Sequence, residues 1–152
     1  MIKYDFQGNI SKFKQDGKSK WSKGTLEEDR YFCHGANKLT PEEAQTYGIN
    51  PMYAQDVAVD NLKKQLGSGK MVYTFIAQKV NNIYKPLSKH KDLWKSKYYF
   101  IFLAPSGTIF WCTGGKIPRG TSEIAFPYIV EPEDIKFVYD ESYKRVAFQA
   151  IV

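Results

Sequence analysis

The stretch Lys97–Cys112, KYYFIFLAPSGTIFWC, carries the clearest structural signal in the chain. Its two halves are rich in aromatic and β-branched residues, which favour strands. Pro105-Ser106-Gly107 between them is typical of a tight turn. Residues 98–103 are apolar at every position, so this strand is predicted to lie centrally in a sheet, covered on both faces. The stretch therefore predicts two β-strands joined as a hairpin.

Two further segments show the strand period of two. Residues 70–80, KMVYTFIAQKV, alternate in polarity, and residues 81–82, Asn-Asn, indicate a turn. Residues 131–152 predict a second hairpin with its turn at 140–143. One face of its first strand is expected to carry Ile135, Phe137 and Tyr139. Together the segments predict about five or six antiparallel strands.

Two helices are predicted before these strands. Residues 40–48 begin with Thr40 as N-cap, followed by proline, and Glu43 completes a capping box. Gly48 is expected to end this helix. Residues 50–67 repeat the Asn-Pro opening and carry apolar residues at helical spacing. The prediction is an α+β protein with two N-terminal helices packed on an antiparallel sheet built from hairpins.

The length of 152 residues suits a single domain spanning residues 1–152, and a hydrophobic content of 43% suits a packed core. Residues 7–25 are polar and glycine-rich, which indicates a mobile basic arm or loop. No apolar run is long enough to cross a membrane, and the first residues lack the apolar core of a signal peptide. We therefore expect an intracellular, cytoplasmic protein with reduced Cys33 and Cys112.

Positive charge is concentrated in residues 63–122, which hold eleven basic residues and one acidic residue. Such a field attracts anions, of which nucleic acid is the commonest large one. Residues 81–97, predicted as a long loop, mix lysines with aromatic rings, as single-strand binders do. The candidate contacts are Tyr84, Lys85, Lys89, Lys91, Trp94, Lys95, Lys97, Lys116 and Arg119, with Tyr84 and Trp94 as stacking rings. The alternative without a binding role is that these lysines face water while Trp94 packs on the core.

The glycine-containing motifs do not predict an enzyme. Residues 67–70, Gly-Ser-Gly-Lys, follow a predicted helix, which is the reverse of the order in a phosphate-binding loop. Residues 113–120, TGGKIPRG, follow a strand but precede no helix, so they indicate either a plain turn or an anion clamp formed by Lys116 and Arg119. No spacing of cysteine and histidine fits a metal site. We therefore interpret the chain as a non-enzymatic binding protein with no cofactor and no metal.

Two alternatives remain open. The segregated charge suits equally a protein-binding inhibitor or adaptor of the mobile-element type, docking on an acidic surface of a host protein. In addition, residues 30–51, with a His-Gly pair after a short apolar strand, and residues 121–138, with a glutamate opening a strand, resemble ADP-ribosyltransferases. The resemblance implies that His34 would bind a nicotinamide cofactor and that Glu123 would be the catalytic acid. It places Tyr98 or Tyr99 at the position of a cofactor-stacking tyrosine.

Overall fold

The computed structural model describes residues 8–11, 21–53, 70–86, 95–112 and 123–151. Within these ranges the chain forms eleven strands, one α-helix and one short 3-10 helix. In chain order they are β1 (Gly8–Ser11), β2 (Ser22–Leu26), β3 (Arg30–Ala36), α1 (Pro41–Tyr47), β4 (Met52–Tyr53), β5 (Lys70–Val80), β6 (Ile83–Pro86), β7 (Tyr98–Ala104), β8 (Ile109–Cys112), β9 (Glu123–Phe126), η1 (Pro132–Asp134), β10 (Ile135–Asp140) and β11 (Arg145–Val146).

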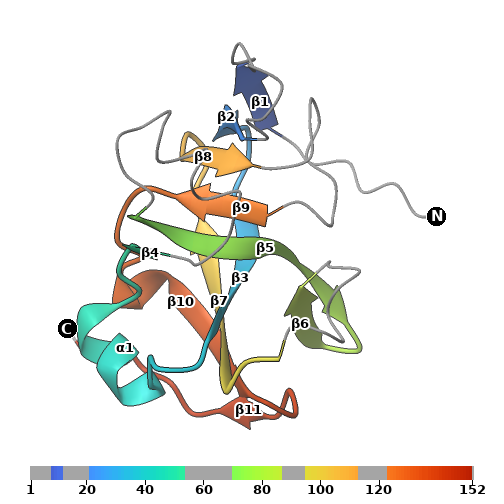
Figure 1. The fold of residues 1–152 in the computed structure, drawn as a ribbon. Helices are drawn as coiled ribbons and strands as arrows, with labels where there is room; N and C mark the ends of the chain where they lie inside the picture. The colour runs from blue at the N-terminus through green and yellow to red at the C-terminus, as the bar shows by residue number, and fades with distance from the viewer. Residues whose placement is uncertain (1–7, 12–20, 54–69, 87–94, 113–122, 152) are drawn as a thin grey trace.

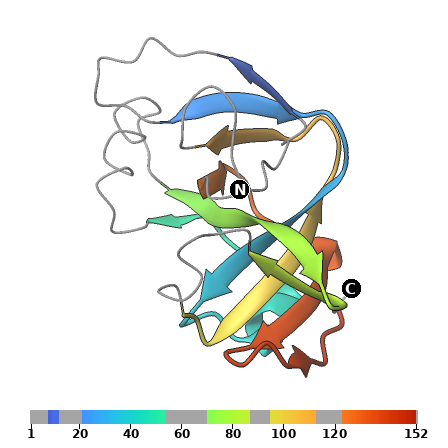
Figure 2. The same ribbon diagram turned by 90° about the vertical axis from the view of Figure 1, so that its right-hand side faces the viewer.

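Nine of the strands form one antiparallel sheet in the order β1-β2-β8-β9-β5-β3-β7-β10-β11 (Figure 1). Strands β4 and β6 pair with β5 outside this order. In Figure 1, β8, β9 and β5 run across the view while β3 and β7 run steeply down it, so the sheet is strongly twisted and bent. The turned view in Figure 2 shows the chain sweeping round this bend from β2 into β3.

The prediction of two N-terminal helices on a sheet of five or six strands is wrong, because the described chain is mostly β. Helix α1 is confirmed, with Thr40 as N-cap in a capping box closed by Glu43. The second helix was expected to begin at Pro51. Instead, Ile49 exchanges backbone hydrogen bonds with Val130, and the following residues continue extended into β4, which pairs with the start of β5. The rest of that predicted helix, residues 54–69, lies outside the described residues.

The strands of the stretch Lys97–Cys112 are confirmed as β7 and β8, but they do not form a hairpin with each other. Strand β7 pairs with β3 and β10, whereas β8 pairs with β2 and β9. Residues 22–36 and residues 98–112 instead run side by side as one antiparallel ribbon that turns a corner. The turn after β7 is tied to the end of β2, since the Gly107 amide donates to Leu26 O and the Leu26 amide donates to Thr108 O. This bend, rather than a hairpin, sets the curvature of the sheet.

Part of the N-terminal segment predicted as a mobile arm or loop, residues 7–25, lies among the described residues. Residues 8–11 form β1, which pairs with β2 in register from Gly8 opposite Leu26 to Ser11 opposite Lys23. Trp21, just before β2, is completely buried. The remaining part of the predicted arm, residues 12–20, lies outside the described residues.

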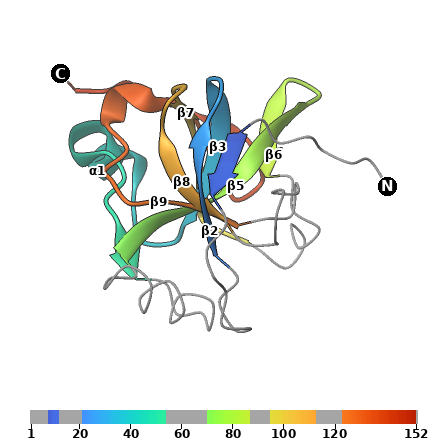
Figure 3. The ribbon, with the colours of Figure 1, turned by 90° about the horizontal axis from the view of Figure 1, so that it is seen from above.

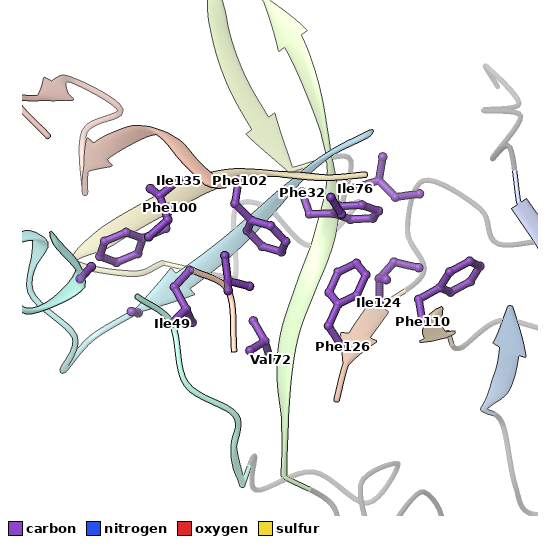
Figure 4. Close-up of a cluster of buried hydrophobic side chains, with 14 of the residues drawn as sticks. Phe32, Ile49, Val72, Ile76, Phe100, Phe102, Phe110, Ile124, Phe126 and Ile135 are labelled. Atoms are coloured by element: carbon purple, nitrogen blue, oxygen red, sulfur yellow. The ribbon is translucent and has the colours of Figure 1, made fainter. Parts of the chain in front are cut away.

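The main hydrophobic core lies on one face of the bent sheet. Phe32, Phe102 and Phe126 meet there, with ring centres 4.9 to 5.9 Å apart. Figure 4 shows these rings together with the aliphatic side chains that pack round them, contributed by β3, β5, β7, β9 and the segment after α1. Strand β7 sits between β3 and β10 and is buried on both faces, as its sequence predicted. The prediction of a centrally placed strand is confirmed.

The opposite face of β3, β7 and β10 is covered by the β5–β6 hairpin. Figures 1 and 3 show α1 on one side of the β3–β7 pair and this hairpin on the other. The predicted turn at residues 81–82 is confirmed, since both asparagines have positive φ, at 51° and 63°. The predicted common face of Ile135, Phe137 and Tyr139 is wrong, because the pairing with β7 shifts between Ile135 and Phe137. This bulge puts Ile135 in the main core and the other two under the hairpin.

Candidate functional site

The face beneath the β5–β6 hairpin combines aromatic rings with cations. Strands β3, β7 and β10 contribute ring side chains that alternate with the residues of the main core. The hairpin adds a tyrosine and two lysines, and β11 adds an arginine. We call this set the cation–aromatic face; it comprises Tyr31, Tyr84, Tyr99, Phe137, Tyr139, Tyr143, Lys79, Lys85 and Arg145.

A first group of rings on this face centres on Tyr84. Its ring centre lies 4.6 Å from that of Tyr31 and 5.3 Å from that of Phe137, and the second pair is stacked. The guanidinium of Arg145 lies over Phe137, 4.9 Å from the ring centre. Lys79 lies 6.0 Å from the centre of the Tyr84 ring. Each of these cations gains about 0.5–1 kcal/mol from its ring at an exposed site, so both have a preferred position on the surface.

A second group centres on Tyr143, in the turn between β10 and β11. Its ring is stacked on Tyr99, with centres 4.5 Å apart and planes inclined by 11°. The ammonium of Lys85 lies over the Tyr143 ring, 4.7 Å from its centre. The Tyr143 ring is thus in contact with both Tyr99 and Lys85. The two groups are joined through the hairpin, where Tyr84 and Lys85 are neighbours in sequence. Each group ends in a cation that lies over one of its rings, Arg145 over Phe137 in the first and Lys85 over Tyr143 in the second.

The lysines before β7 adjoin the second group. The Tyr99 hydroxyl accepts a hydrogen bond of 3.1 Å from the backbone amide of Ser96. Lys95 and Lys97, on either side of Ser96, are exposed. The amide of Lys97 donates to the Asn37 side chain at 3.1 Å, which anchors this segment to the end of β3. The segment that carries Lys95 and Lys97 therefore adjoins the second group.

Acidic groups near the face are few among the described residues, and one is engaged by the backbone. Asp140 Oδ1 accepts hydrogen bonds from the amides of Ser142 and Lys144, at 2.8 and 3.0 Å. These hydrogen bonds partly offset the negative charge of the Asp140 carboxylate. Glu141, in the same turn, is exposed to solvent. Its negative charge would oppose an anion arriving at this turn.

The structure brings together the four predicted nucleic-acid contacts that lie among the described residues. Tyr84 and Lys85 lie on the cation–aromatic face, and Lys95 and Lys97 lie beside it. The predicted long loop over residues 81–97 begins instead with β6. The other predicted contacts lie outside the described residues; they are Lys89, Lys91, Trp94, Lys116 and Arg119.

Several members of the face were missed in the sequence. Tyr31, Phe137 and Tyr143 read there as core or turn residues, and Arg145 lies outside the basic segment. The usable signal was alternation: every second residue of β3, β7 and β10 lies opposite the main core, and these residues include Tyr31, Tyr99, Phe137 and Tyr139. A strand with large apolar residues on both faces needs a cover on each, and here the second cover is the β5–β6 hairpin.

The transferase residues are not brought to a common site. Cys33 pairs with Phe75 across β3 and β5, and Phe75 pairs with Glu123 across β5 and β9, so these three share one face of the sheet. His34 follows Cys33 and therefore points to the opposite face. Its Nδ1 lies 2.7 Å from the carbonyl oxygen of Tyr73, so this nitrogen carries a proton that it donates. Burial lowers the pKa of His34, which makes it a neutral structural histidine.

The remaining reactive groups of the described chain are also shielded. Cys33 and Cys112 are free and buried, as predicted for reduced thiols, and burial raises the pKa of both, that of Cys112 to about 12. The described residues contain no group of three His, Cys, Asp or Glu side chains that could hold a metal ion. No helix among them is long and apolar enough to span a bilayer.

Comparison of this chain with protein-family models, with curated proteins and with solved structures finds no match.

Proposed function

We propose that this protein binds nucleic acid through the cation–aromatic face. The observation that carries the proposal is that both ring groups end in a cation, Lys85 over Tyr143 and Arg145 over Phe137. Nucleic acid offers the two chemistries that such a face complements, namely phosphate charge and flat bases. The intracellular setting predicted from the sequence is where nucleic acid is abundant and where free cysteines stay reduced.

Preorganisation of the cations favours phosphate binding. A free lysine or arginine side chain loses about 0.5–1.5 kcal/mol of conformational freedom when a ligand immobilises it. A cation that already rests on a ring has lost part of that freedom before the ligand arrives. Arg145 can in addition present two parallel N–H groups to one phosphate, which strengthens and orients the contact.

Direct contact with phosphate makes the expected binding salt-dependent and largely independent of sequence. Besides Lys85 and Arg145, the exposed cations within or beside the face are Lys79, Lys95, Lys97, Lys136 and Lys144. Each phosphate contact adds about 0.7 to 0.9 to the slope of log affinity against log salt concentration. The aromatic rings favour nucleic acid over an acidic protein surface, since protein carboxylates need no flat stacking partner.

Fluorescence anisotropy with labelled DNA and RNA oligonucleotides tests the proposal. We expect affinity at about 50 mM salt that falls steeply by about 200 mM. The double variant Lys85→Ala/Arg145→Ala should bind about 10-fold more weakly, with a salt slope shallower by about 1.4 to 1.8. Lys23→Ala is the control for each single substitution, Lys85→Ala or Arg145→Ala, because it also removes one charge and Lys23 lies in β2, at the other end of the sheet from β10 and β11. It should change affinity far less.

Two results would contradict the proposal. The first is no affinity for any oligonucleotide at low salt. The second is an equal loss of affinity in the Lys23→Ala control, which would mean that net charge rather than this face is responsible. Recovery of one stoichiometric acidic protein after nuclease treatment, lost in the double variant, would instead favour the inhibitor or adaptor alternative.

A further inference from the structure

Exposed apolar side chains gather where α1 ends. Ile49 and Val130 exchange backbone hydrogen bonds there, and the side chains of both are buried in the main core. Because side chains alternate along extended backbone, Ile129 and Glu131, which flank Val130, point away from that core. Both are exposed, Ile129 by 46%. Tyr47, the last residue of α1, is 66% exposed.

The last described segment adds a third exposed apolar side chain. The amide of Ile151 donates to Gln45 O at 2.8 Å, which holds this segment against α1, and Ile151 is 62% exposed. Figure 1 shows this end of the chain beside α1. Single exposed apolar residues are common on proteins, but a group contributed by three segments is typical of a protein contact. We call this surface the acidic–apolar patch; it comprises Tyr47, Ile129, Glu131 and Ile151.

Further acidic side chains border the acidic–apolar patch. Glu42 and Glu43, in the first turn of α1, are exposed, and so is Glu133 in η1, which packs against α1. Two lysines lie nearby: Lys136 donates to Glu133 O at 2.8 Å, and Lys38 is exposed just before α1. Acids outnumber bases here among the described residues, so a second patch of the same kind would meet like charge. The patch therefore favours a basic partner over a symmetric contact with itself.

The chain itself carries a basic surface, the cation–aromatic face. This face lies under the β5–β6 hairpin, on the other side of the β3–β7 pair from α1 (Figures 1 and 3). One molecule therefore cannot bring its own patch onto its own face, whereas two molecules can. The net charge of +6 on each copy does not prevent this contact, because charges separated by more than about 10 Å are largely screened at 0.1 M salt.

We infer that copies of this chain associate head to tail, with the acidic–apolar patch of one copy on the cation–aromatic face of the next. Cations such as Lys85 and Arg145 then lie opposite Glu131 and the acids beside it, while Ile129 and Ile151 are removed from water. Because the contact joins two different surfaces, every assembly keeps one free patch and one free face unless it closes into a ring. The association therefore grows with concentration. It goes beyond the proposed function and does not depend on it.

Sedimentation velocity of the nuclease-treated protein over a range of concentrations tests the inference. We expect the weight-average mass to rise above that of the monomer at about 50 mM salt and to return to it at about 300 mM, because the charge contacts are screened. Ile129→Thr should weaken the association about 5-fold, since less apolar area is buried. Ile109→Thr is the matched control, because Ile109 is 43% exposed and lies in β8, outside both surfaces. It should associate as the unaltered protein does.

A mixture of two variants distinguishes a head-to-tail contact from a symmetric one. Ile129→Thr/Glu131→Gln alters only the patch, and Lys85→Ala/Arg145→Ala alters only the face, so each variant alone should remain a monomer at concentrations where the unaltered protein associates. Mixed in equal amounts, the two variants retain one intact patch and one intact face. They should form a 1:1 dimer that does not grow further.

Three results would overturn the inference. A monomer at every concentration in low salt would leave the patch to a basic protein other than this chain. Association that is unchanged in Ile129→Thr would place the contact elsewhere on the surface. A mixture of the two double variants that stays monomeric would rule out the pairing of patch with face. Because no nucleic acid is present in these experiments, none of the three results bears on the proposed function, which the oligonucleotide titrations test.

Discussion

The hydroxyl of Tyr139 accepts a hydrogen bond of 3.3 Å from the backbone amide of Tyr84. It links β10, within the sheet, to β6, in the hairpin that covers it, across 55 positions of sequence. The same hairpin carries Lys85, whose ammonium rests on Tyr143. The position of the cation–aromatic face therefore depends on a contact between the hairpin and the sheet.

Tyr139→Phe should lower the free energy of unfolding by about 0.5–1.5 kcal/mol, because the Tyr84 amide loses its acceptor while the ring packing stays. Urea denaturation measures the change. Tyr47→Phe is the control, since Tyr47 is 66% exposed and its hydroxyl meets water. An equal effect of the two substitutions would show that the Tyr139 hydrogen bond does not stabilise the hairpin.

Glu141→Gln should raise the affinity for oligonucleotides about 2- to 3-fold at low salt. Glu141 is exposed in the turn that carries Tyr143, so its charge opposes phosphate near Lys85. Interactions of exposed charges are worth up to about 1 kcal/mol. The gain should disappear as salt is raised, because the interaction is screened. Anisotropy titrations at two salt concentrations measure it, and an unchanged or lower affinity at low salt would place the ligand away from this turn.

Local signals in the sequence predicted local structure well. The capping box at Thr40 and Glu43, the Asn-Asn turn and the apolar strand β7 are all present as predicted. These features depend on neighbours in sequence, which propensity and capping rules describe. The Asn-Pro signal at residues 50–51 failed because the flanking chain pairs with Val130 and with β5, and such distant partners leave no mark in a local pattern.

The pairing of strands was the part that the sequence could not predict. A proline-serine-glycine turn between two strands predicts a hairpin. Here the turn lies at the bend where the paired segments 22–36 and 98–112 change direction together. The cation–aromatic face was missed for the same reason. Its members come from β3, β5, β6, β7, β10, β11 and the turn between β10 and β11, and they meet only through this topology. Alternation shows that a strand has a second face without showing what covers that face.

Gly48→Ala should destabilise the protein more than Gly107→Ala, although both glycines have positive φ, at 67° and 87°. A Cβ at Gly48 would overlap Val130 O, in the bridge that ties the end of α1 to the chain before η1, whereas one at Gly107 meets nothing within 4 Å. We expect about 1–2 kcal/mol for Gly107→Ala from backbone strain, and at least about 1 kcal/mol more for Gly48→Ala. Urea denaturation of the pair measures this difference, and equal losses would contradict the close approach.

Acidification should destabilise the protein through His34. Burial lowers the pKa of this imidazole below its usual 6.5, so the folded state binds fewer protons than the unfolded state. The stabilisation is complete above pH 6.5 and is lost as pH falls through the folded pKa, with a slope of at most about 1.4 kcal/mol per pH unit. Above about pH 5, most carboxylates have not yet titrated, so the window from 6.5 to 5 isolates the histidines.

His34→Asn should flatten this dependence. The asparagine amide can still donate to the Tyr73 carbonyl from near the position of Nδ1, but it does not titrate. His90→Asn removes the other histidine of the chain and should leave the slope in place. Urea denaturation midpoints measured at intervals across this pH window test whether His34 causes the pH dependence of stability. A slope that persists in His34→Asn, or one that vanishes in His90→Asn, would assign the proton uptake to a group other than His34.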